Sequence, residues 1–150
     1  MATMTLDDAM VAFIAEHPHA AMMTVGDDGR PKAVKMEASL VDGHLESAGH
    51  ADKVRTRRLR RDNRCTLYFA DDEHRWLTLE TDVEIVEGDA APQRLLRYFR
   101  IREGRPTEPL DYHSDRSHHH ALDDSAFKQV MAEEESVLYR FRVRKSYGNV

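Results

Sequence analysis

The sequence lacks the features that mark secreted and membrane-spanning proteins. It contains one cysteine, Cys65, which cannot form a disulfide within the chain and is expected to be a small buried core residue. No apolar run approaches the roughly 20 residues that a transmembrane helix needs. The first 13 residues include two aspartates and lack the basic and then apolar order of a secretion signal. We therefore expect a soluble, cytoplasmic protein with no membrane partner.

The sequence also lacks the glycine-rich motifs of the common nucleotide-binding folds. No Gly-x-Gly-x-x-Gly follows the first predicted strand, and neither a Gly-Lys-Ser/Thr loop nor a Gly-x-Ser-x-Gly elbow occurs. With 27 acidic and 22 basic residues the net charge is -5, which disfavours a dedicated nucleic-acid-binding protein. A length of 150 residues with 41% hydrophobic content predicts one domain covering residues 1–150.

Hydrophobic periodicity predicts a mainly β protein whose strands are joined by hairpins. From residue 32 to residue 40 apolar and polar side chains alternate, and the Asp42-Gly43 pair after them suits a tight turn. We predict strands near residues 20–25, 32–40, 44–47, 64–70, 76–86 and 137–144, and helices near residues 6–14, 52–62, 92–101 and 123–134. The polar stretch at residues 102–120 is expected to be a mobile loop or lid. Six strands joined by hairpins favour an antiparallel barrel with short helices outside it.

The strongest local signal is a basic segment, residues 53–64, with the sequence KVRTRRLRRDNR. Like charges three and four residues apart destabilise a helix by roughly a few tenths of a kcal/mol per pair, so a bound polyanion or carboxylates must offset that cost. Asp52 is expected to cap a helix here, and the N-terminal end of a helix attracts anions. The residues expected around that end are Ser47, Gly49, His50, Lys53 and Arg55. The alternatives are a solvated basic face paired with acidic side chains and a nucleic-acid site, which predicts a steep salt dependence.

Three further features together resemble a known family. Residues 28–31 read Asp-Gly-Arg-Pro between two strands, the second strand alternates, and residues 57–62 lead into a strand that starts Arg-x-Thr-Leu. This order resembles the split-barrel flavin and deazaflavin oxidoreductases related to pyridoxamine 5'-phosphate oxidase. Within that group it is similar to the actinobacterial branch that uses the deazaflavin coenzyme F420. Members of that branch carry a basic residue, a gap, a lysine and then Arg-Asn-Leu-Arg-Arg-Asp-Pro-Arg, a pattern that falls here on Lys53, Arg55 and residues 57–64.

The resemblance implies a fold and a set of cofactor contacts. The fold is a mainly β, α+β protein: a six-stranded antiparallel split β-barrel of the FMN-binding type with short peripheral helices. In the family the first two basic residues bind the cofactor phosphate, second-strand residues line the ring system, and the cofactor lies between the subunits of a homodimer. The contacts expected by resemblance are Lys35, Met36, Ser47, Lys53, Arg55, Arg57, Arg58 and Trp76. Arg58 replaces the usual asparagine, and Thr81 replaces a usual glycine.

The resemblance also implies a reaction class, with alternatives that stay open. The first is an F420-dependent oxidoreductase that transfers hydride between the reduced deazaflavin and an unsaturated small molecule. The second is an FMN-dependent oxidase or reductase of the same fold, and the third is a carrier that binds F420, FMN or haem without turnover. Pyridoxamine phosphate oxidation itself is disfavoured, because residues 144–148 lack the Arg-x-His substrate signature of that enzyme. The extra cation at Arg58 favours the polyglutamylated tail of F420.

Three weaker features have simple structural interpretations. The consecutive histidines at residues 118–120 are expected to face solvent, because no cysteine or carboxylate set at ligand spacing accompanies them. Tyr112 and His113 lie in the same polar stretch, where a loop position permits a proton-donor role without assigning one. The alternating arginines at residues 140, 142 and 144 are expected to form the exposed face of an edge strand. We therefore predict no metal and assign no catalytic acid.

Overall fold

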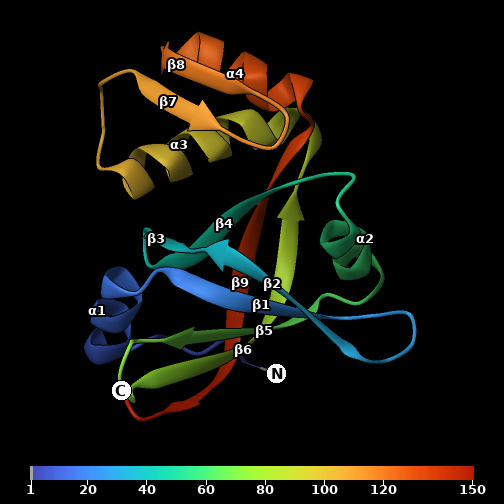
Figure 1. Cartoon of the computed structure of the whole chain (residues 1–150), viewed down its shortest axis with the longest axis vertical. Helices are drawn as coiled ribbons and strands as arrows, with labels where there is room; N and C mark the ends of the chain where they lie inside the picture. Colours follow the sequence, from blue (N-terminus) through green and yellow to red (C-terminus); the bar gives the residue numbers. More distant parts are fainter. Residues whose placement is uncertain (1) are drawn as a thin grey trace.

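A computed structural model describes residues 2–150 as a curled antiparallel sheet with helices around it and a small hairpin above one end (Figure 1). The elements in chain order are α1 (Asp8–Glu16), β1 (His19–Val25), β2 (Pro31–Glu37), β3 (Ser39–Val41), β4 (His44–His50), α2 (Val54–Arg61), β5 (Arg64–Ala70), β6 (Trp76–Val86), the 3-10 turn η1 (Gly88–Ala90), α3 (Ala91–Glu103), β7 (Leu110–His113), β8 (His118–Leu122), α4 (Asp124–Glu133) and β9 (Ser136–Gly148). This arrangement confirms the predicted α+β split-barrel fold.

The main sheet has the strand order β2-β1-β5-β6-β9-β4-β3, and every neighbouring pair is antiparallel. Its two edges, β2 and β3, are separated in the chain by one residue, Ala38. The sheet therefore has to curl on itself into an open barrel. The predicted count of six strands is wrong: the described chain has seven strands in this sheet and two more in the β7–β8 hairpin. Side-chain alternation runs through Ala38 without a break, so β2 and β3 were predicted as one strand.

A β-bulge interrupts the pairing of the two longest strands, β6 and β9. Glu80 pairs with Lys145, whereas the next residue, Thr81, pairs with Val143, so β9 has one residue more than β6 at this point. The buried Thr81 hydroxyl donates a hydrogen bond of 2.7 Å to the Cys65 carbonyl oxygen. Bulges bend a strand and increase its twist, which suits a sheet that closes toward a barrel. Thr81, which stands where the resembling family usually has glycine, is therefore accommodated on β6, opposite the bulge of β9.

The interpretation of β9 as an edge strand is wrong. β9 lies between β6 and β4 and is hydrogen-bonded on both sides. Its outward arginines face acids of β6: Arg142 pairs with Glu84 and Arg144 with Asp82, each at 2.8 Å. Apolar and charged side chains can alternate along an edge strand, and also along a central strand when the neighbouring strand supplies the opposite charge. The sequence pattern of β9 therefore could not distinguish the two positions.

The apolar side chains form two clusters that share β9. Its residues 137, 139, 141 and 143 point into the barrel cluster, which contains Phe13, Leu67 and Phe69, whereas Leu138 points into a second cluster. That second cluster lies beneath α3, α4 and the β7–β8 hairpin, which form a separate upper layer in Figure 1. Because successive side chains of β9 point to opposite faces, this strand packs against both the barrel cluster and the upper layer.

Residues 102–120 are a packed segment and not the mobile loop that was predicted. They contain β7 and the start of β8, and the Arg100 guanidinium donates hydrogen bonds of 2.8 Å to the carbonyl oxygens of Arg105 and Glu108. The Tyr112 ring is buried between Phe99 and Phe127, with ring centroids 5.5 and 5.9 Å away. The segment is polar overall, and a few apolar anchors are enough to fix it.

Candidate functional site

Helix α2 carries the basic segment and follows β4 after a short turn. The predicted helix is confirmed, but the predicted cap is wrong: the N-cap residue is Lys53, with no side-chain capping bond, and Asp52 forms an ion pair with Arg116. Thr56 and Leu59 are the buried residues of the helix, so most of its cations remain at the surface. Because no side chain caps the first turn, the positive end of the helix is available to an anionic ligand.

A buried contact fixes where this helix begins. The Thr56 hydroxyl donates a hydrogen bond of 2.7 Å to the His50 carbonyl oxygen and is also hydrogen-bonded to the Tyr139 hydroxyl. Tyr139 lies against Gly49, where an added Cβ would come within 2.5 Å of the ring carbon Cζ. Glycine is therefore required at this position by the close approach of the ring, and Tyr139 connects β9 to the N-terminal end of α2.

Arg55, one of the predicted phosphate ligands, is partly buried at the start of α2. Its guanidinium lies over the Tyr139 ring, 5.5 Å from the centroid, and Nη2 donates to the Ala48 carbonyl oxygen at 3.3 Å. Its Nε is buried and has no hydrogen-bond partner among residues 2–150. A buried donor without an acceptor costs free energy, so this atom fits a site completed by an anionic ligand.

Three further cations of α2, Arg57, Arg58 and Arg61, line a hollow of about 540 Å³ between the helix and the β1–β2 turn, which we call the α2 hollow. Its lining residues are Gly26, Asp27, Asp28, Lys32, Val54, Arg57, Arg58 and Arg61. Arg61 pairs with Asp27, and Lys32 pairs with Asp28 at 3.2 Å. The Arg58 carbonyl oxygen accepts from the Asp62 amide at 2.8 Å, but within the described chain the Arg58 side chain has neither an ion pair nor a hydrogen bond. Four cations against two carboxylates leave this hollow positively charged.

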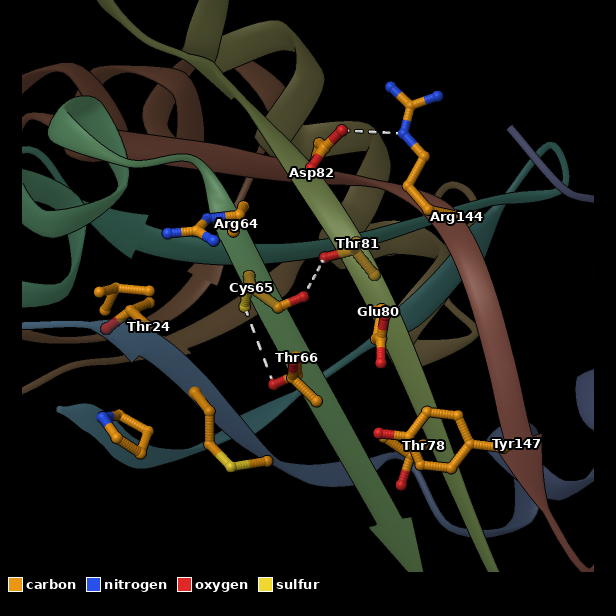
Figure 2. A pocket seen from close by; sticks show the side chains of 13 residues that line it. Thr24, Arg64, Cys65, Thr66, Thr78, Glu80, Thr81, Asp82, Arg144 and Tyr147 are labelled. Atoms are coloured by element: carbon orange, nitrogen blue, oxygen red, sulfur yellow. Dashed lines mark hydrogen bonds and ion pairs between the residues drawn. The ribbon is translucent and has the colours of Figure 1, made fainter. Parts of the chain in front are cut away.

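A second hollow of about 640 Å³ lies on the outer face of the sheet, and we call it the sheet hollow (Figure 2). It is lined by Met23, Thr24, Val25, Pro31, Arg64, Cys65, Thr66, Thr78, Glu80, Thr81, Asp82, Arg144 and Tyr147. The ends of β1 and β2 separate it from the α2 hollow: Val25 and Pro31 line one, whereas Gly26 and Lys32 line the other. Sequence reasoning missed this site. The polar face of residues 76–86 was the available signal, but it is equally typical of a solvent-exposed strand.

The outer face also carries three partly exposed aromatic rings. Tyr68 and Trp76 have ring centroids 6.1 Å apart, and Trp76 and Tyr147 meet edge-on at 6.2 Å. Lys35 lies on the same face, beside Tyr68, in a shallower hollow of about 430 Å³. Two of the predicted ring-pocket residues, Lys35 and Trp76, are thus on the outer face and not beside α2.

The structure therefore brings together only part of the predicted set. Lys53, Arg55, Arg57 and Arg58 gather at α2. The Met36 side chain is packed in the barrel core, and the buried Ser47 hydroxyl donates a hydrogen bond of 2.6 Å to the Glu37 carbonyl oxygen. Lys53 Nζ lies 2.5 Å from Asp115 on the β7–β8 turn.

A buried carboxylate lies behind the start of α2. Glu134, which follows α4, accepts hydrogen bonds from the ring of His50 at 3.0 Å, from Ser114 at 2.9 Å and from Ser117. Burial alone would raise the pKa of Glu134, but the hydrogen bonds from Ser117, His50 and Ser114 outweigh it and lower the pKa below its usual value. His50 is therefore held inside the structure and does not line an anion pocket.

Two other candidate groups can be placed. Burial raises the pKa of the Cys65 thiol to about 12, which fits a core residue and not a nucleophile. Nδ1 of His113 lies 2.8 Å from Nδ1 of His118, and the His113 and His120 rings are 5.5 Å apart. No group of three metal-ligating side chains converges anywhere in the described chain.

Comparison with known proteins identifies the family. The family model described as pyridoxamine 5'-phosphate oxidase matches residues 6–136, so the chain belongs to this family. None of the curated proteins compared matches the sequence. No helix within residues 2–150 is long and apolar enough to cross a membrane.

Solved structures share the fold. A conserved hypothetical protein of Mycobacterium tuberculosis is 24% identical, with a TM-score of 0.71 over 99% of this chain and 87% of that chain. A protein described as an F420 reductase is 17% identical, with a TM-score of 0.64 over 95% and 98%. A haem-binding protein of Mycobacterium smegmatis is 17% identical, with a TM-score of 0.60 over 93% of this chain and 51% of that chain. At these identities the likeness concerns the fold.

Proposed function

We propose that this protein is a cytoplasmic F420-dependent oxidoreductase that transfers hydride between reduced deazaflavin and an unsaturated small molecule. The observation that carries the proposal is the surplus of cations at α2. One phosphate needs Lys53 and Arg55, whereas Arg57, Arg58 and Arg61 extend the positive surface along the α2 hollow. F420 carries carboxylates on a glutamate tail beyond its phosphate, and FMN ends in a single phosphate. A row of cations suits the longer polyanion.

In this scheme the residues of the chain bind the cofactor and orient the substrate. Lys53 and Arg55 hold the phosphate, with the unpartnered Nε of Arg55 as one donor, and Arg58 meets the tail. When bound, the deazaflavin supplies the hydride chemistry. Hydroxyl groups of Thr66, Thr78 and Tyr147 line the sheet hollow and give a polar surface on which a small substrate can be oriented. No side chain is assigned as proton donor, and water fills that role.

The proposal includes a homodimer with the cofactor at the subunit interface. Members of this family are typically dimers. In the monomer the aromatic side chains of Tyr68 and Tyr147 are about two-fifths exposed on the outer face, beside Trp76. Exposed aromatic rings grouped on one sheet face are typical of a surface that a partner covers. A dimer formed through this face would bring Lys35 and Trp76 toward the cofactor of the second subunit.

FMN is the second candidate cofactor, with an oxidase or reductase activity. The resemblance to split-barrel flavin oxidoreductases supports it, and the planar fork of Arg55 suits a terminal phosphate. A carrier that binds F420, FMN or haem without turnover is the third candidate. A yellow protein on purification would favour FMN, and tight binding without reduction of any acceptor would favour the carrier.

The test is a fluorescence titration of the purified protein with F420 and with FMN. We expect micromolar or tighter F420 binding that the Lys53→Ala, Arg55→Ala double variant weakens by at least about tenfold. The matched control is Arg97→Ala with Lys128→Ala, which removes two cations from α3 and α4. Arg58→Ala should weaken F420 binding more than FMN binding. If the wild type binds neither cofactor, the oxidoreductase assignment is wrong.

A further inference from the structure

The turn between β7 and β8, residues 114–117, lies against the start of α2. Asp115 on this turn accepts a hydrogen bond from Lys53 Nζ at 2.5 Å, and Arg116 pairs with Asp52. The hydrogen bond from Lys53 is the largest cause that lowers the pKa of Asp115, so its carboxylate is charged at neutral pH. Lys53, the first of the proposed phosphate ligands, therefore already has an anion beside it.

The turn itself is held in place by hydrogen bonds to Glu134 and does not depend on the Lys53–Asp115 pair. Ser114 and Ser117 both donate hydrogen bonds to the buried Glu134 carboxylate, and Arg116 Nη1 donates to the Glu134 carbonyl oxygen at 2.9 Å. Lys53 is the only polar side-chain partner of Asp115 in the described chain. About three-fifths of the Asp115 side chain is exposed, so a ligand can reach this pair from solvent and displace the carboxylate at little cost.

We infer that Asp115 is a specificity-determining residue: it is the resident counter-ion of Lys53, and a ligand must bring more negative charge than one carboxylate to displace it. This inference rests on the proposed function and names the ligand class that the site admits. Exchanging one exposed carboxylate for another gains little free energy, because both form the same kind of ion pair. A phosphate joined to further anionic groups contacts Lys53 and the α2 hollow together, and that combined attraction displaces Asp115.

A purely structural role for Asp115 predicts the opposite result. If the Asp115 carboxylate only orients Lys53 for the ligand, removing its charge leaves the lysine disordered and weakens binding. If it competes with the ligand, removing its charge strengthens binding. The sign of the change in affinity therefore separates the two roles.

The experiment is a fluorescence titration of the full chain with F420 at low ionic strength, where screening is weak. We expect Asp115→Asn to bind F420 about three- to tenfold more tightly, because one negative charge beside the ligand is lost. Asp111→Asn is the matched control: it lies on the same hairpin, and its carboxylate accepts from the Ala121 amide at 2.9 Å and does not contact Lys53. The gain should vanish when Asp115→Asn is combined with Lys53→Ala.

Each outcome has a defined meaning. Unchanged or weaker F420 binding by Asp115→Asn overturns the inference, and so does an equal gain in Asp111→Asn or a gain that persists without Lys53. If wild-type binding depends on Lys53 and Arg55 while Asp115→Asn matches the wild type, the inference alone is wrong. If no variant binds F420, the proposed function and the inference are both wrong. Thermal melts followed by circular dichroism confirm that each variant is folded.

Discussion

Replacing Gly49 by alanine should strongly destabilise the fold at the point where β4 leads into the basic helix. The added Cβ would lie 2.5 Å from Cζ and 2.6 Å from Cε2 of Tyr139, closer than real Cβ atoms approach a neighbour. The Tyr139 ring is fully buried, its hydroxyl is hydrogen-bonded to Thr56, and the β4–β9 ladder fixes both backbones. The ring cannot move aside without loss of these contacts. We expect a cost of about 3 kcal/mol, at the upper end for overpacking a core.

The measurement is urea unfolding followed by circular dichroism at fixed protein concentration. With an m-value of about 2 kcal/mol/M, the midpoint should fall by about 1.5 M. Gly26→Ala is the control, because the two atoms that its Cβ would approach within 3.0 Å, Lys32 Cε and Asp28 Oδ1, belong to side chains that can turn into solvent. The nearest backbone atom, the Arg30 carbonyl oxygen, is 3.2 Å away. In a Tyr139→Ala background, Gly49→Ala should cost much less than it does alone. A Gly49→Ala midpoint within error of the wild type would refute this account of the contact.

Two further predictions concern titration. The pKa of Glu134 is lower in the folded protein than in the unfolded chain, so its ionised carboxylate stabilises the fold. This contribution is complete at neutral pH, which lies above the pKa of the unfolded chain. It is lost as the pH falls through the pKa of the folded protein. Urea midpoints should decline below about pH 5, and Glu134→Gln should flatten that decline; parallel curves would contradict the hydrogen-bond assignment. Cys65 has a pKa of about 12 in the folded protein, so very little of it is thiolate at pH 8. A thiol reagent should therefore react with it about a thousandfold more slowly in the native protein than in urea. Equal rates in the two states would show that the thiol is accessible.

The barrel could be predicted because side-chain alternation reports which face of a strand is buried. The same signal does not report which strands are partners. The pattern through Ala38 is continuous although the hydrogen-bonding partner changes there, and the arginines of β9 alternate in the same way on a central strand as on an edge. The β7–β8 hairpin was missed because its apolar anchors are few and lie far apart in the sequence.

The sequence alone predicts the cations of the candidate site, but it does not predict which residues from other elements contact them. The cations of α2 are dense enough to be recognised in the sequence alone. The contact between Lys53 and Asp115 joins residues 62 positions apart, and the sheet hollow combines residues of β1, β2, β5, β6 and β9. Neither arrangement leaves a local pattern, because each depends on how the strands are ordered around the barrel.

The single residue that separates β2 from β3 links the two edges of the open barrel covalently, although these edges are not hydrogen-bonded to each other. In an open sheet the two edge strands can shift independently, but here Ala38 ties one edge to the other, and its amide is itself held by the Pro18 carbonyl oxygen at 2.9 Å. The strands β2, β3 and β4 are therefore joined by connections of one and two residues, and β4 leads into α2. Lys35 on the outer face and the basic helix are thus linked by a stretch of chain that contains no long loop.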